Sequence, residues 1–234
     1  MRLRRMANPR DAAVLQRFFK TGPGEYGAGD RFLGIRVPAI RKLAAELDEL
    51  ALRDVASLLR SPFHEERLLA LLLFVRLFRR GDAKQRERIY NLYLKNTRFI
   101  NNWDLVDLTA PHIVGAYLVD KSKKPLQHLA RSALLWERRI AIVATFQFIR
   151  LDDFGPTLKV AGLLLSDTED LIHKAVGWML REVGKRDIEA EEAFLVRHYR
   201  GMPRTMLRYA IERFPERKRR QYLKGTILRG VEPT

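Results

Sequence analysis

Two tryptophans, an aspartate and an arginine are the residues of this sequence whose types and spacing suit chemistry. Asp107 follows Trp103 by four residues, so the two side chains share one face of a helix, one turn apart. Trp178 follows Lys174 by the same interval, and Arg139 lies between these two pairs. If the helices stack in register, two indoles, one carboxylate and one guanidinium converge on one surface. The alternative for each tryptophan is packing in the core.

Other catalytic constellations have little support. The chain has no cysteine, which excludes a thiol nucleophile, an iron–sulfur cluster and a thiolate zinc site. Its five histidines are scattered and form no HExxH motif or other pair of ligands at helical spacing. The sequence also lacks a GxSxG nucleophile elbow and the glycine signature of dinucleotide-binding folds. We therefore expect neither a metal nor a cofactor.

The elements that must position these residues follow a repeat. A register with steps of 36, 36, 35 and 34 residues recurs at Arg67, Trp103, Arg139, Lys174 and Arg208. A period of this length with two helices per unit is typical of an α-solenoid. We predict an all-α fold of HEAT-like helical repeats that forms one curved domain over residues 1–234. The four cations of the register would then line a basic concave face, unless they pair with acids such as Glu66 and Glu137.

Local signals agree with a helical chain. Ser61-Pro62 predicts the start of an apolar helix that runs to Arg80 and stops at Gly81. Capping-box spacing occurs at Asp82–Gln85 and Ser166–Glu169. Further starts are predicted near Pro38, Asn102, Pro125, Leu134, Pro156, Asp187 and Pro203. The glycine-rich stretch at 21–38 matches no phosphate loop, so we interpret it as an ordered connection, with a direct role in ligand binding as the alternative.

The charge balance indicates the class of partner. Lys and Arg number 44 and Asp and Glu 28, which gives a net charge of 44 − 28 = +16, while 47% of the residues are hydrophobic. A folded surface with this excess of cations favours a polyanion such as DNA or RNA. The longest apolar run has eight residues, whereas a membrane-spanning helix needs about 20. We expect a soluble, cytoplasmic protein without a signal peptide or a membrane partner.

Four blocks of the sequence resemble the AlkD family of DNA alkylation repair proteins, which are HEAT-like DNA glycosylases. The blocks are FLGIRVP at 32–38, NNWDLVDLTAPHIVG at 101–115, WERRIAI at 136–142 and HKAVGWMLREVGK at 173–185. The second and fourth are the most specific, because they combine unusual aromatic and acidic placement with the repeat period. The resemblance covers most of the chain.

The resemblance implies roles for individual residues. Asp107 matches the catalytic aspartate of the family, Trp103 and Trp178 match its active-site tryptophans, and Arg139 matches the arginine that holds DNA beside the lesion. Arg41 matches a basic residue near the DNA surface, although the neighbouring Arg36-Val37 depart from the polar pair of the family. Together with the register cations, the expected DNA-binding set is Arg139, Lys174, Arg67, Arg208 and Arg41.

The implied function is excision of cationic alkylated purines, of the 3-methyladenine and 7-methylguanine type, from double-stranded DNA. The base is already a good leaving group, and the family is known for leaving it unflipped in the duplex; no base pocket can be recognised in the sequence. We expect a monomer that works in the cytoplasm, at the nucleoid if the source is bacterial. The alternative is a non-catalytic HEAT-like scaffold that binds nucleic acid. A third possibility, a peptide-binding solenoid, would need a groove matched to an acidic partner, which the sequence does not show.

Overall fold

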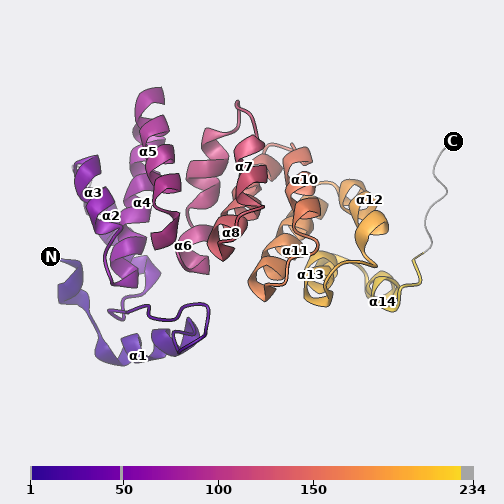
Figure 1. The fold of residues 1–234 in the computed structure, drawn as a ribbon, viewed down its shortest axis with the longest axis horizontal. Coiled ribbons are helices and arrows are strands. Elements are labelled where there is room, and N and C mark those ends of the chain that lie inside the picture. The colour runs from indigo at the N-terminus through magenta and orange to yellow at the C-terminus, as the bar shows by residue number, and fades with distance from the viewer. Residues whose placement is uncertain (1, 48–49, 228–234) are drawn as a thin grey trace. The chain divides into compact units, whose positions relative to one another are not determined.

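The computed structural model describes residues 2–47 and 50–227, and the chain divides into two compact units, Met1–Tyr117 and Leu118–Thr234. Every regular element of the described residues is a helix, and the one β-type contact among them is an isolated bridge between Arg31 and Phe63. The prediction of an all-α fold of helical repeats is confirmed (Figure 1). The single domain, its curvature and its basic concave face stay predictions.

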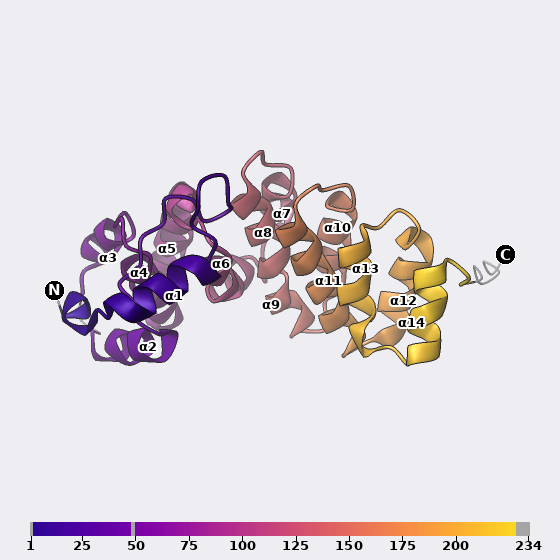
Figure 2. The ribbon, with the colours of Figure 1, turned by 90° about the horizontal axis from the view of Figure 1, so that it is seen from below.

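The first unit is built around one long apolar helix. Its elements are η1 (Leu3–Met6), α1 (Pro9–Phe18), α2 (Val37–Glu46), α3 (Leu52–Leu58), α4 (His64–Arg80), α5 (Ala83–Lys95), η2 (Thr97–Phe99), α6 (Trp103–Asp107) and the π-helical turn η3 (Pro111–Gly115). Helix α4 is buried over most of its length, and α2, α3, α5, α6 and η3 all pack against it. Helix α1 runs across this unit, over α4 and toward α6 (Figure 2).

The second unit is centred on α11. Its elements are α7 (Lys124–Leu129), α8 (Leu135–Ala144), α9 (Phe146–Ile149), α10 (Gly155–Leu163), α11 (Asp170–Gly184), α12 (Ile188–His198), α13 (Arg204–Ala210), η4 (Ile211–Arg213) and α14 (Glu216–Lys224). Helix α11 packs against α8, α10, α12 and most closely α13. A Cβ atom at Gly177 would lie 2.4 Å from the carbonyl oxygen of Met206, so only glycine lets α13 approach this closely.

Most predicted helix boundaries are confirmed within one residue, but the start predicted at Ser61-Pro62 is wrong, because α4 begins at His64 with Phe63 as its N-cap. Helix α4 ends at Arg80 with Gly81 as its C-cap, and Asp82 caps α5 by accepting a hydrogen bond from the amide of Gln85. The predicted capping box at Ser166–Glu169 is wrong, because the N-cap of α11 is Glu169 and its side chain caps nothing. Among the described residues, no helix has the length and apolarity needed to span a bilayer.

The glycine-rich connection is anchored to the start of α4. The buried carboxylate of Glu65 accepts hydrogen bonds from the amides of Leu33, Gly34 and Ile35 at 2.8, 2.8 and 3.1 Å. Gly34 has φ +82°, and a Cβ there would lie 2.1 Å from the carbonyl oxygen of Asn8. The segment is an ordered connection, as interpreted from the sequence, and its Phe32 stacks on Phe19, which lies just before it.

Candidate active site

Helix α6 carries two of the predicted catalytic residues on a single turn and a half. Its N-cap, Asn102, is fully buried and accepts a hydrogen bond from the amide of Trp103 at 2.9 Å. Pro111 limits the helix at the other end, because its ring clashes with the carbonyl of the residue four before it, which is Asp107. The chain continues as the π-helical turn η3. The cap and the proline therefore fix both ends of the turn that bears Trp103 and Asp107.

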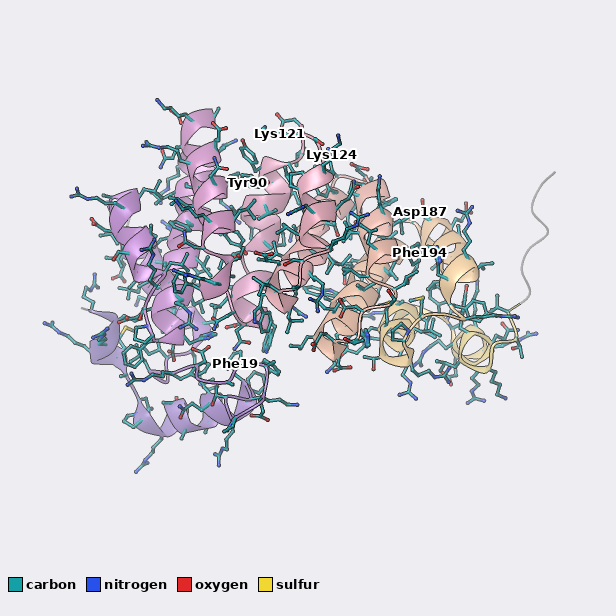
Figure 3. All side chains as sticks on the ribbon, viewed as in Figure 1. Phe19, Tyr90, Lys121, Lys124, Asp187 and Phe194 are labelled. Carbon is teal, nitrogen blue, oxygen red and sulfur yellow. The ribbon has the colours of Figure 1, made fainter. Side chains whose placement is uncertain are left out.

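Trp103 and Asp107 both line a cavity of about 520 Å³ in the first unit. The indole of Trp103 stacks on Phe19, with ring centroids 5.2 Å apart and planes inclined by 26°, and meets Phe18 edge-on at 6.0 Å. Phe32 stacks on Phe19 from the other direction at 5.0 Å. Phe19, labelled in Figure 3, lies on the side of α4 that faces α1. The cavity thus has an aromatic wall with a carboxylate beside it, a feature that we did not recognise in the sequence.

A buried ionic cluster lies behind α6; we call it the His64 cage, consisting of His64, Asp30, Asp104 and Arg67. The imidazole Nδ1 of His64 lies 2.9 Å from a carboxylate oxygen of Asp30, and its Nε2 lies 2.9 Å from one of Asp104. Arg67 donates to the other oxygen of Asp30 at 2.7 Å. Side-chain exposure is 2% for His64, 1% for Asp30, 7% for Asp104 and 5% for Arg67. The cage joins the connecting segment, α4 and α6.

The two carboxylates keep His64 protonated. Burial by itself lowers the pKa of the imidazole, but attraction to Asp104 and Asp30 and the hydrogen bonds to both outweigh burial and raise it to about 9. Burial likewise favours a higher pKa for Asp30, yet the contacts with His64 and Arg67 hold that pKa below its ordinary value. The cage therefore sets two cationic side chains, those of His64 and Arg67, against the carboxyl groups of Asp30 and Asp104, and both His64 and Asp104 line the cavity.

Arg67 and Arg139, which were predicted to bind DNA from a basic concave face, are both buried in their units. Arg67 is 4% exposed and is held by Asp30 and by the carbonyl oxygen of Ser61, so its guanidinium belongs to the core of the first unit. Arg139, in α8, is 5% exposed and donates to the carbonyl oxygen of Leu171 at 2.5 Å, which fastens α8 to the start of α11. Arg67 is paired with an acid, as the alternative expected, but that acid is Asp30. Glu66, which the alternative named, pairs with Arg4 instead.

The remaining predicted cations have exposed or half-exposed side chains. Arg41 in α2 and Arg208 in α13 are exposed. Lys174 in α11 is half-buried and forms an ion pair with Asp170, one turn before it, at 2.7 Å. A pair of this kind is exposed and exchangeable, so it leaves the ammonium accessible to a phosphate. These three residues keep the exposure that a DNA contact requires.

Trp178 lies on α11 in the second unit and is half-buried. Its indole Nε1 donates to Glu182 at 3.1 Å, and its ring lies 6.1 Å from that of Phe146. Its partial exposure fits a contact residue, and the bond to Glu182 sets the orientation of the indole. The convergence of Trp178 with Trp103 stays a prediction, because the two residues belong to different units.

Comparison with known proteins places the chain in a family. The family model for the DNA alkylation repair enzyme matches residues 1–214, which span both units. The chain belongs to the DNA alkylation repair enzyme family. A solved structure, a predicted DNA alkylation repair enzyme from Enterococcus faecalis, is similar over 90% of this chain and 97% of that one, with a TM-score of 0.69. At 17% identity this likeness concerns the fold alone. No curated protein matches the chain.

Membership of the DNA alkylation repair enzyme family confirms the resemblance stated from the sequence. Two groups of residues around Trp103 and Asp107 were not predicted from the sequence: the His64 cage and the stacked rings of Phe19 and Phe32. The partners Asp30 and Asp104 lie 34 and 40 residues from His64, so no local spacing announces them. The sequence held one weak signal for Asp104. This aspartate is followed directly by the apolar Leu105 and Val106 in a short helix, and all three residues are buried.

Proposed function

We propose that this DNA alkylation repair enzyme is a DNA glycosylase that hydrolyses the N-glycosidic bond of cationic alkylated purines in duplex DNA. The observation that carries the proposal is the position of Asp107 on the aromatic cavity beside Trp103, in a chain of this family. The substrates are lesions of the 3-methyladenine and 7-methylguanine type. No metal or cofactor enters the proposed reaction.

The proposed chemistry uses charge already present on the lesion. Alkylation of a purine ring nitrogen makes the base cationic, so it leaves without being protonated. As the bond breaks, positive charge moves to the deoxyribose, and the carboxylate of Asp107 stabilises that oxocarbenium-like state. Asp107 also orients the water that attacks the anomeric carbon. The aromatic faces of Trp103 and Trp178 lie against sugar C–H groups, which become more positive in the transition state.

The proposal does not require base flipping, and the lining of the cavity supports this. An enzyme that reads a flipped base needs hydrogen-bonding groups directed at the edge of that base. In the cavity, His64 and Asp104 bond to each other and Glu65 bonds to backbone amides. Arg36, exposed and 3.9 Å from Asp11, lines the cavity as well. Few groups are thus directed toward a base edge, and we propose that the cavity serves the sugar and its lesion-bearing strand.

Arg41, Lys174 and Arg208 are the proposed phosphate contacts. Cations that neutralise phosphates supply most of the affinity for duplex DNA without reading its sequence. Arg139 enters this proposal as a support for α11, the helix of Trp178, because its guanidinium is buried against the carbonyl of Leu171. We propose that the protein acts on DNA as a monomer.

Release of free methylated purine from alkylated duplex DNA tests the function. Purified protein and its Asp107→Asn variant are incubated with methylated DNA, and released bases are separated and quantified. Release by the parent and not by the variant supports a glycosylase. A parent that binds the duplex tightly and releases no base would instead identify a non-catalytic nucleic-acid-binding scaffold.

A further inference from the structure

His64 is a buried, strongly perturbed titratable group beside the candidate site that the proposed reaction does not use. Both of its ring nitrogens lie 2.9 Å from carboxylate oxygens. Where both carboxylates are ionised they only accept hydrogen bonds, and each ring nitrogen then carries a proton, in agreement with the raised pKa of His64. The ring is also held by aromatic neighbours: Phe32 stacks on it at 4.5 Å and 21°, and Phe19 lies 5.1 Å away at 35°.

Two routes connect this imidazolium to the catalytic turn. The first runs through Asp104, whose carboxylate lies 2.9 Å from Nε2 of His64. Asp104 directly follows Trp103 and lies three residues before Asp107 on the five-residue helix α6. The second is aromatic: Phe19 contacts the His64 ring on one side and stacks on the Trp103 indole at 5.2 Å on another. Within the first unit, His64 therefore contacts α6 directly through Asp104, and it contacts through Phe19 a ring that stacks on Trp103.

The charged surroundings of His64 leave Asp104 dependent on it. The carboxylate of Asp30 contacts both His64 and Arg67. The carboxylate of Glu65, the next residue of α4, accepts hydrogen bonds from three backbone amides of the connecting segment. Asp104 is buried and accepts a hydrogen bond from the amide of Leu105 through one carboxylate oxygen, while the other lies 2.9 Å from Nε2 of His64. Removing the imidazolium leaves this buried carboxylate without its cation, and the short α6 turn must move to hydrate it.

We propose that His64, held between Asp30 and Asp104, is a positioning residue that fixes the α6 turn so that Trp103 and Asp107 face the cavity in the geometry that excision requires. The inference rests on the proposed glycosylase function and adds to it a residue that touches no substrate. Displacing a reacting group by about 1 Å can cost on the order of a hundredfold in rate while leaving binding intact. Loss of His64 should therefore act on the chemical step.

The first arm of the test measures excision and DNA binding separately. Single-turnover release of 7-methylguanine and the affinity for an unmodified duplex are measured for the parent, His64→Gln, and a control, His128→Gln, at an exposed histidine of α7. We expect His64→Gln to release the base about 10- to 100-fold more slowly with an affinity within about twofold of the parent, and the control to match the parent. Circular dichroism checks that each variant is folded.

A rescue variant isolates the route through Asp104. In His64→Gln/Asp104→Asn the orphaned carboxylate is replaced by a neutral amide, so most of the lost rate should return. A double variant as slow as His64→Gln would contradict this route.

The second arm needs no enzymatic activity. The protein has three tryptophans, so Trp136→Phe/Trp178→Phe leaves Trp103 as the only indole. In this background we expect the emission of Trp103 to change between pH 7 and 10 with a midpoint near 9, the pKa of His64, and this transition to vanish when His64→Gln is added. Parental excision by His64→Gln, or an unchanged Trp103 transition, overturns the proposal. A parent that releases no base defeats the proposed function instead, while the emission still decides the role of His64.

Discussion

Asp107 is the side chain on which the proposed chemistry depends most. A charge pair at about 4 Å in a partly shielded site is worth roughly 4 kcal/mol, which corresponds to about a thousandfold in rate. We predict that Asp107→Asn keeps the fold and the affinity for DNA while its single-turnover rate of 7-methylguanine release falls by about that factor. Removal of a negative charge near phosphates should even tighten binding. A variant that excises at nearly the parental rate would make Asp107 a structural residue.

The two indoles should contribute less than the carboxylate. Contact between an aromatic face and a cationic group is worth about 1 to 2 kcal/mol in a desolvated site, or about 5- to 30-fold in rate. We predict slowing of this size for Trp103→Ala and for Trp178→Ala in the same release assay. Trp136, half-buried at the start of α8, supplies the matched control as Trp136→Phe, which should leave the rate unchanged. If Trp103→Ala and Trp178→Ala release the base as fast as Trp136→Phe, the two indoles do not contribute to the reaction.

At the scale of the element, the His64 cage makes the stability of the first unit depend on pH. The pKa of His64 is raised in the folded protein from 6.5 to about 9, so the stabilisation is fully present below pH 6.5 and is lost as the pH rises through 9. A shift of this direction and size corresponds to roughly 3 kcal/mol as an order of magnitude. We predict that urea unfolding shows the parent losing stability between pH 7 and 10. His64→Gln should be less stable at pH 7 and lose much less over the same interval. If the parent and His64→Gln lose the same free energy of unfolding between pH 7 and 10, the cage does not cause the pH dependence.

The elements were predictable where the signal is local. Gly81, Asp82, Asn102 and Asp187 mark helix ends through the conformation or the hydrogen bond of one residue, and the structure places helix ends at each of them. The error at Ser166 has the same origin, because the spacing of a capping box does not ensure that the serine takes the cap position.

Properties that depend on distant residues were not predictable. Arg67 and Arg139 share a register with the exposed Arg208, yet they are buried because Asp30 and the carbonyl of Leu171 accept their hydrogen bonds. Those partners lie 37 and 32 residues away. Repeat periodicity fixes which helix face a residue occupies, but the partner decides whether a long cationic side chain lies in the core or at the surface.

At the scale of the whole molecule, the net charge of +16 should control binding to DNA. Log affinity falls with log salt by about 0.9 per phosphate neutralised, so the slope counts the contacts. We predict that Arg41→Ala, Lys174→Ala and Arg208→Ala each weaken duplex binding and lower the slope by about one. Lys84→Ala, at an exposed lysine of α5 outside the proposed set, is the control. If all four variants bind with the parental slope, the DNA surface lies elsewhere.

The central claim is that excision uses the positive charge of the lesion and the negative charge of Asp107, without an acid that protonates the base. The most direct test compares cationic and neutral lesions in side-by-side single-turnover assays. Duplexes carrying 7-methylguanine or 3-methyladenine should lose the base in the presence of the parent protein, whereas matched duplexes carrying uracil or hypoxanthine should not. Efficient release of uracil would contradict the account, because a neutral pyrimidine leaves readily only with hydrogen-bond donors or an acid directed at it.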